Sequence, residues 1–235
     1  MYAIFKRELN AYFTTMQGYV FMAVFLTIAG LGFLLRCVFP GVASLSGVFY
    51  FIIDTMIILI PILTMRLMSE DKKNKTDQIL VTAPVPTAHI VLGKYFAACV
   101  LFVLTSLLTL IFPVIMAIFG TPVLVLEMIS GYLGLWLLAM ALIALGLFIS
   151  SLTEHQFIAM LLTLISIAFL MIVVDALISA LENSRISALL KWFSLLDRFI
   201  TTFDSGLLSL SAILFYVSFS ALFLNLTALL TAKSR

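Results

Sequence analysis

Long stretches without a charged residue constrain this chain more than any other feature. Only Asp54 interrupts the second of them. The stretches are Leu9–Leu35, Cys37–Met65, Tyr95–Leu126, Met128–Thr153, Gln156–Val174 and Ser205–Ala232. A helix needs about 20 apolar residues to cross a bilayer core, and every stretch is close to that length or longer. Because 10% of the residues are charged, against about 25% in soluble domains, most of the apolar surface must face lipid.

The predicted fold is therefore an all-α integral membrane protein with six transmembrane helices. Helices are favoured over a β-barrel because the stretches lack the alternation of apolar and polar residues that barrel strands show. The expected spans are Gly18–Leu35, Gly47–Met68, Lys94–Phe119, Met128–Ser151, Gln156–Ser179 and Leu207–Thr231. Residues 1–235 contain no repeat or linker, so we expect a single transmembrane domain. Gly131, Gly134 and Gly146 should let the fourth span pack closely against a neighbour.

Two amphipathic segments accompany the spans. In residues 1–16, apolar residues recur at helical spacing while Lys6, Arg7 and Glu8 fall on another face. This pattern predicts an elbow helix lying in the inner membrane interface, and the alternative is a simple extension of the first span. Before the sixth span, a second stripe predicts an outer amphipathic helix in which Arg198 faces away. That stripe consists of Ile186, Leu189, Leu190, Phe193, Leu196, Ile200 and Phe203.

The distribution of basic residues predicts the orientation in the membrane. Six spans place both termini on one side, which then carries nine of the thirteen Lys and Arg residues. These are Lys6, Arg7, Arg66, Lys72, Lys73, Lys75, Lys94, Lys233 and Arg235, against Arg36, Arg185, Lys191 and Arg198 on the other side. The positive-inside rule makes the first side cytoplasmic. We expect a multi-pass protein of the cytoplasmic (inner) membrane with both termini in the cytoplasm and no cleaved signal peptide.

The loop between the second and third spans gathers most of the remaining polarity. It reads RLMSEDKKNKTDQILVTAPVPTAHIVLGK from Arg66 to Lys94. Thr76 can cap a short helix over Asp77–Ala83, which Pro84 would stop. The apolar residues of that helix would face water, as expected of an element that docks on a cytosolic partner. The other reading is a solvated loop whose lysines meet anionic lipid. The apolar residues in question are Ile79, Leu80 and Val81.

The order of residue types in this loop resembles the cytosolic loop of type-2 ABC transporter permeases, the membrane subunits of ABC exporters. The matching residues are Arg66, Glu70-Asp71, Lys72, Thr76, Ile79-Leu80, Pro84-Val85 and Gly93-Lys94. Residues Gly146–Ala159 are similar to the turn between spans four and five in that family. Within the family, the chain resembles the gliding-motility and copper-enzyme-maturation branch. It departs from the family at Lys75, where a Gly usually precedes the Thr.

The resemblance implies that the short helix sits in a groove of a separate ATPase subunit. Glu70 and Asp71 would lie at that contact, and Glu154 and His155 would form a smaller second one. The full set of implied ATPase-coupling residues is Glu70, Asp71, Lys72, Thr76, Asp77, Ile79, Leu80, Pro84, Glu154 and His155. ATP and Mg²⁺ would be bound by the partner, so this chain is expected to bind no cofactor or metal. The sequence contains no G-x-x-x-x-G-K-[ST] motif, so we expect no ATP hydrolysis by the chain alone.

The partners implied by the resemblance are a dimeric cytosolic ABC ATPase and a second copy of this permease or a similar one. The lipid bilayer surrounds them, an accessory subunit is left open, and nucleic acid is not expected. Asp54, Arg36 and Asp175 are candidates for the transport pathway, because charges at bilayer depth are costly and often functional. With few polar residues to line it, that pathway suits lipid, peptide or another hydrophobic cargo.

Three other classes of function compete with an exporter. A membrane enzyme needs several polar groups at one depth, and the spans carry almost none. An ion-coupled secondary transporter would use Asp54 and broken helices, for which Pro61 and Pro113 are candidates. A membrane-embedded assembly scaffold would use the elbow helix and the loop for docking alone.

Overall fold

A computed structural model describes residues 1–41, 45–73, 86–118, 125–181, 191 and 193–233. Six helices in these residues are long and apolar enough to cross a membrane. They are Met16–Val38, Leu45–Lys73, Thr87–Ile118, Val125–Leu152, Gln156–Ala180 and Leu210–Ala232. The described residues contain no strand, so the all-α membrane fold is confirmed. Span three begins at Thr87, well before the predicted Lys94, because Lys94 is buried inside the helix and does not mark its boundary.

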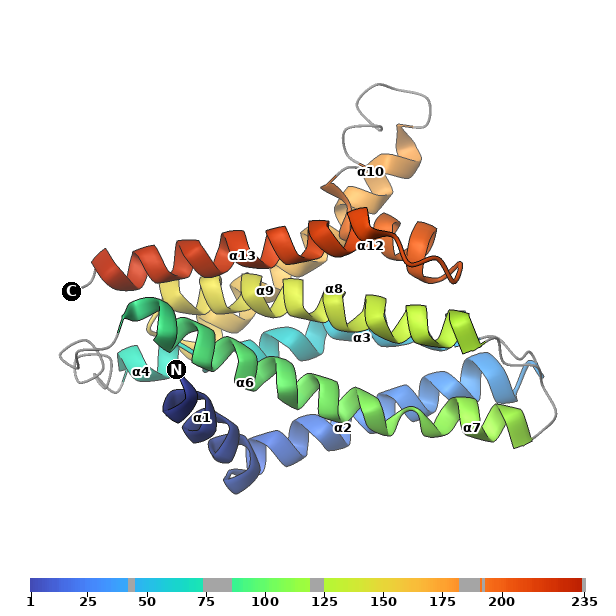
Figure 1. Cartoon of the computed structure of the whole chain (residues 1–235), viewed down its shortest axis with the longest axis horizontal. Coiled ribbons are helices and arrows are strands. Elements are labelled where there is room, and N and C mark those ends of the chain that lie inside the picture. Colours follow the sequence, from blue (N-terminus) through green and yellow to red (C-terminus); the bar gives the residue numbers. More distant parts are fainter. Residues whose placement is uncertain (42–44, 74–85, 119–124, 182–190, 192, 234–235) are drawn as a thin grey trace.

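Most spans are built from more than one helical element. The elements on the N-terminal half are α1 (Tyr2–Thr14), α2 (Met16–Phe33), η1 (Leu34–Val38), α3 (Leu45–Thr64), α4 (Ser69–Lys73), α6 (Thr87–Leu108) and α7 (Ile111–Ile118). Those that follow are α8 (Val125–Leu152), α9 (Gln156–Ala168), η2 (Phe169–Val173), α10 (Val174–Ala180), α12 (Leu195–Arg198), η3 (Phe199–Phe203) and α13 (Leu210–Lys233). The elbow helix α1, helix α4 and the end of α13 lie at one end of the bundle (Figure 1). We predict that this end is cytoplasmic and call it the inner end, and the opposite end is called the outer end.

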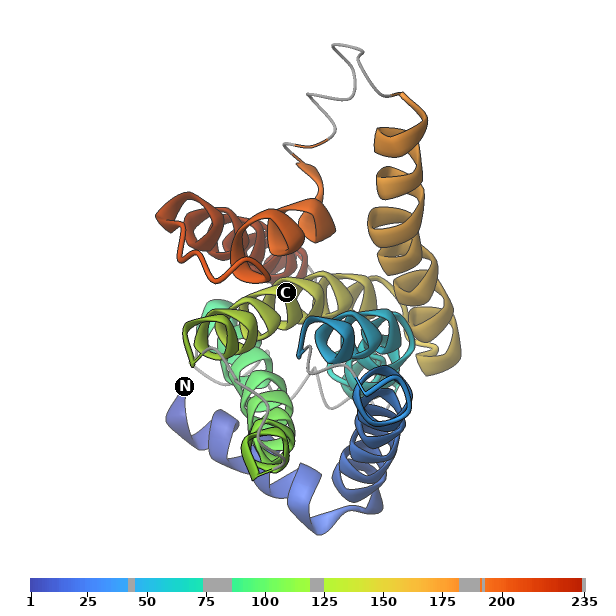
Figure 2. The same cartoon turned by 90° about the vertical axis from the view of Figure 1, so that its right-hand side faces the viewer.

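Helix α8 forms the centre of the bundle and packs against α3, α6, α9 and α13 (Figure 2). Its glycines allow these close approaches. A Cβ atom on Gly131 would lie 2.3 Å from the Phe49 ring, and one on Gly134 would lie 2.5 Å from the Phe203 ring. On Gly146, it would lie 2.4 Å from Thr64 Oγ1. The predicted role of these three glycines in tight helix packing is confirmed.

Span five leaves the bundle towards the outer end. Its first part, α9, packs against α8 and α3. The chain then passes through a π-helical turn, η2, and α10 projects away from the other spans (Figures 1 and 2). A π-turn shifts the helix register and often redirects a helix. The outer half of span five therefore exposes apolar side chains that the other spans of this chain do not cover.

The elbow helix α1 is confirmed, but the predicted exposure of Glu8 is wrong. It packs across α6, where Ile4 lies against Gly93 at the distance of close contact. The half-buried face includes Ile4, Leu9 and Tyr12, as expected, but also Glu8, which we predicted on the exposed face. Glu8 turns inwards because Lys94 of α6 offers its carboxylate an ion pair, which helical periodicity alone does not reveal.

The outer segment before span six is helical at α12 and η3, but its buried face differs from the prediction. Leu195, Phe199 and Phe203 are buried, whereas Phe193 is 72% exposed. Ser194 has an extended backbone and interrupts the helix, and its side chain accepts from the amide of Asp197 as the N-cap of α12. The residues after Ser194 therefore do not continue the helical face on which Phe193 lies. Residues 182–190 lie outside the described part of the chain. The residue predicted to face away, Arg198, instead packs over the ring of Phe215, with Cζ 4.2 Å from the ring centre.

Two hydroxyl groups attach this outer segment to the bundle. Tyr216 of α13 donates to the carbonyl of Leu195 at 2.6 Å. Tyr50 of α3 donates to Oδ2 of Asp204 at 2.7 Å. These bonds link the segment to spans six and two. Nothing in the sequence pattern indicates these roles for Tyr50 and Tyr216.

Candidate functional site

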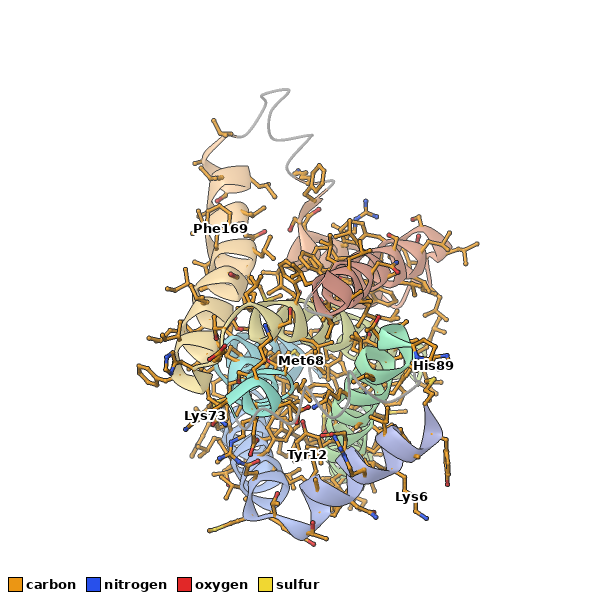
Figure 3. The ribbon with its side chains drawn as sticks, turned by 90° about the vertical axis from the view of Figure 1, so that its left-hand side faces the viewer. Lys6, Tyr12, Met68, Lys73, His89 and Phe169 are labelled. Carbon is orange, nitrogen blue, oxygen red and sulfur yellow. The ribbon has the colours of Figure 1, made fainter. Side chains whose placement is uncertain are left out.

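The inner end of the bundle, where α4 follows span two and α6 begins span three, is the candidate functional site. Figure 3 looks onto this end and shows Met68 near its middle and Lys6 of α1 towards its edge. The described chain stops at Lys73 and resumes at Pro86. The predicted short helix lies between them, so its residues Thr76, Asp77, Ile79, Leu80 and Pro84 lie outside the described residues.

A buried ion-pair cluster joins three elements at this end. Lys94 of α6 is 3% exposed, and its Nζ lies 2.6 Å from Oδ2 of Asp71 in α4. The same Nζ lies 3.5 Å from Oε1 of Glu8 in α1 and donates to the carbonyl of Leu67 at 2.5 Å. We call these four residues the Lys94 cluster. A buried ammonium is tolerated only when charges and acceptors surround it, and this one has both.

The carbonyl in this cluster is available because α3 ends early. Helix α3 stops at Thr64, and the chain makes a turn before α4 begins at Ser69. Leu67 lies in this turn, and a buried carbonyl outside a helix needs a donor. Lys94 supplies that donor to Leu67 and also neutralises Asp71 in the first turn of α4.

One side chain of span four holds the same turn from the other side. The hydroxyl of Ser150, which is fully buried, accepts from the amides of Met68 and Ser69, each at 3.2 Å. It also lies 3.2 Å from the carbonyl of Met65, to which it donates. Next along α8, the carbonyl of Ser151 accepts from Lys72 Nζ at 2.5 Å. The connection between α3 and α4 is therefore fixed to the inner end of α8.

Replacing Ser150 with Ala should destabilise this connection. The variant leaves two buried amides without their acceptor, which costs about 1–3 kcal/mol. We expect a lower melting temperature of the purified protein, measured by intrinsic fluorescence. Ser151→Ala is the matched control, because among the described residues the Ser151 hydroxyl bonds only the carbonyl of Phe148 in its own helix, at 2.6 Å. Equal melting temperatures for the two variants would contradict the role of Ser150.

The predicted coupling residues divide into internal and exposed groups. Asp71 and Lys72 make the internal contacts described above, and the Asp71 side chain is only 20% exposed. Glu70 is 42% exposed and lies 4.0 Å from Arg66 Nε. Glu154 and His155, in the turn between α8 and α9, are also exposed. This turn lies beside α4, so the structure brings the exposed residues to one end of the bundle.

The three pathway candidates do not form one site. Asp54 is exposed on α3, and within the described chain it forms no ion pair with Arg36 of η1, although the Arg36 charge acts on it. Asp175 of α10 is half-buried and interacts electrostatically with Asp197 of α12. Among the described residues, no group of three or more His, Cys, Asp or Glu side chains is placed to hold a metal ion.

Sequence reasoning missed the roles of Glu8, Lys94 and Ser150. A signal was present for Lys94, because a single cation followed by a long apolar stretch needs a partner at the same depth. Nothing in the sequence indicated which carboxylate would supply it. Ser150 gave no signal, since serines are common in membrane helices.

Comparison with known proteins identifies the family. A family model described as "ABC-2 family transporter protein" matches residues 16–224. No curated protein matches the chain. The matched region runs from the start of span one into span six and includes α4, the Lys94 cluster apart from Glu8, and the turn that carries Glu154. With six spans and a match over most of its length, this chain belongs to the ABC-2 family of transporter proteins and is a membrane-embedded permease.

Proposed function

We propose that this chain is the permease subunit of an ATP-driven exporter and is moved by a separate, dimeric ABC ATPase. The observation that carries the proposal is the way α4 is joined to its neighbours. Asp71 connects it to α6 and, through Lys94, to α1, while Lys72, Met68 and Ser69 connect this stretch to α8. A displacement of the loop that follows α4 would therefore reach spans two, three and four together.

The exposed residues at the inner end suit contact with the ATPase. Glu70 lies at the start of the loop, and Glu154 and His155 lie in the neighbouring turn. The ATPase would hold ATP and Mg²⁺, and closure of its two subunits would pull on the loop. In this arrangement the inner end and both termini lie in the cytoplasm, and the spans cross the cytoplasmic membrane.

A second copy of this chain, or a similar permease, would complete the pathway. Asp54 is exposed on a membrane span, and an Asp at the centre of a span costs roughly 2.5–3.5 kcal/mol against lipid. We therefore assign the Asp54 face of α3 to water in the pathway or to the second protomer. The apolar surface that surrounds it favours a hydrophobic cargo.

Charge reversal at exposed positions tests the contact with the ATPase. The chain is purified with an affinity tag from its own host, and the co-purifying ATPase activity is measured. Glu70→Lys and Glu154→Lys should each weaken association about tenfold or more, because like charges at an interface repel. Lys6→Glu, a reversal at an exposed position of α1, should leave association unchanged.

Asp71 is unsuitable for this test, because its replacement would also break the Lys94 cluster. If both glutamate variants retain the ATPase and its stimulation, the acidic contact is wrong. If no ATPase co-purifies with the unmodified chain, the result favours a membrane-embedded assembly scaffold over an ATP-driven exporter.

A further inference from the structure

A polar pocket and an apolar groove meet at the inner end of spans one and two. The pocket, of about 280 Å³, lies between α1, α4 and the starts of α2 and α6. The groove, of about 370 Å³, runs along α2 and α3. Tyr12, Gln17 and Arg66 line both, so the polar pocket and the apolar groove lie side by side and share these residues.

The groove has the dimensions and surface of an acyl-chain site. Its floor consists of the buried side chains of Phe21, Leu59 and Leu63, and Val20 and Val24 form its exposed rim. Between Met16 and Val24, α2 rises about 12 Å at 1.5 Å per residue, close to the 15 Å thickness of one leaflet. A chain lying here would enter from the inner leaflet and end near the bilayer centre.

The charges of the pocket select the headgroup. Its walls carry three carboxylates, from Glu8, Glu70 and Asp71, against the two cations Arg66 and Lys94. The Lys94 ammonium is 3% exposed and already occupied within its cluster, whereas the Arg66 side chain is 39% exposed. Arg66 Nε donates to Oε1 of Gln156 at 3.2 Å, so its Nη atoms are the cationic donors open to a phosphate, and Arg66 lines both the pocket and the groove.

An anionic headgroup fits this arrangement poorly, because it would add negative charge to a pocket with an excess of carboxylates. A headgroup with a phosphate and an ammonium a short distance apart fits better. The phosphate would pair with Arg66, and the ammonium would donate to the carboxylates, of which Glu70 lies 4.0 Å from Arg66. The phenol of Tyr12 lines the pocket as a neutral group, and burial raises its pKa further.

We propose that this site binds one phosphatidylethanolamine molecule of the inner leaflet, with its phosphate at Arg66 and one acyl chain in the groove between α2 and α3. A primary ammonium is required, since a choline headgroup has no N–H to donate to the carboxylates. The lipid would fill the space between the elbow helix and span two. It would thereby connect α1 to α3 where few direct contacts do so.

Native mass spectrometry of the purified chain tests the proposal without any ATPase. The protein is equilibrated with equal amounts of phosphatidylethanolamine, phosphatidylglycerol and phosphatidylcholine that carry identical acyl chains. We expect one phosphatidylethanolamine to be retained in preference to the others. Arg66→Gln should reduce its retention about tenfold, as expected for a lost charge-assisted contact.

Two further variants keep the result interpretable. Val24→Trp fills the groove and leaves every charge in place, so it should also abolish selective retention. Lys73→Gln removes an exposed cation of the same membrane face that does not line the site, and should retain the lipid as the unmodified chain does. Equal retention of the three lipids, or full retention in both Arg66→Gln and Val24→Trp, would overturn the proposal. A disulfide between two copies of Val20→Cys in membranes would also overturn it, by showing that a second copy covers the groove.

Discussion

Lys94→Met is expected to produce the largest loss of stability at the inner end. The substitution preserves the length of the apolar stem and removes the ammonium. Asp71 and Glu8 would then both lose the ammonium, although Arg7 Nη2 still lies 2.6 Å from Oε1 of Glu8, and the carbonyl of Leu67 would lose its donor. Breaking a buried ion pair from one side costs about 3 kcal/mol or more. For a chain of this size, we expect the melting temperature to fall by roughly 6–12 °C.

A double variant separates this charge effect from a simple packing defect. Asp71→Asn in the Lys94→Met background removes the carboxylate that has lost the ammonium, so it should recover part of the lost stability. Lys73→Met provides the control, because Lys73 is an exposed neighbour of Lys72 on α4. Two results would contradict this role of the cluster. One is a melting temperature of Lys94→Met equal to that of the unmodified chain, and the other is a further loss of stability when Asp71→Asn is added to Lys94→Met.

Gly134→Val should separate the outer segment from the centre of the bundle. Even the first added atom would lie 2.5–2.8 Å from the side chain of Phe203, which is fully buried. Neither α8 nor η3 can yield easily, because Ser130 of α8 also donates to the carbonyl of Phe203 at 2.8 Å. Overpacking of this kind costs about 1–3 kcal/mol, and we expect the upper end of that range.

Gly30→Val is the matched control for this experiment. Gly30 also lies within a span, but a Cβ atom there would have no neighbour within 4 Å. Both variants exchange Gly for the same β-branched residue in a helix, so the difference between their melting temperatures isolates the contact with Phe203. A melting temperature for Gly134→Val that is equal to that of Gly30→Val would show that the segment docks elsewhere.

The candidate site was only partly predictable from the sequence. The order of residue types in the loop pointed to the inner end of the bundle, where Glu154 and His155 are exposed and the Glu70 side chain is 42% exposed. Asp71 and Lys72 belong to the same region, yet their described contacts lie within the chain. The difference arises because an acidic residue in a motif looks the same in the sequence whether its side chain faces solvent or pairs with a buried Lys. Only the packing of α6 against α1 and α4 decides between the two.

The number of spans, their approximate bounds and the elbow helix could be predicted from the sequence. Each follows from the cost of placing charges or unpaired backbone groups in hydrocarbon, and that cost acts locally along the chain. The side chains that meet became known only from the packing of the helices: Lys94 with Asp71 and Glu8, Ser150 with the turn after α3, and Phe203 with Gly134. These pairings depend on how each helix is rotated and where it crosses its neighbours. Hydrophobic periodicity limits that geometry but does not fix it, as the rotated face of the segment from Leu195 to Phe203 shows.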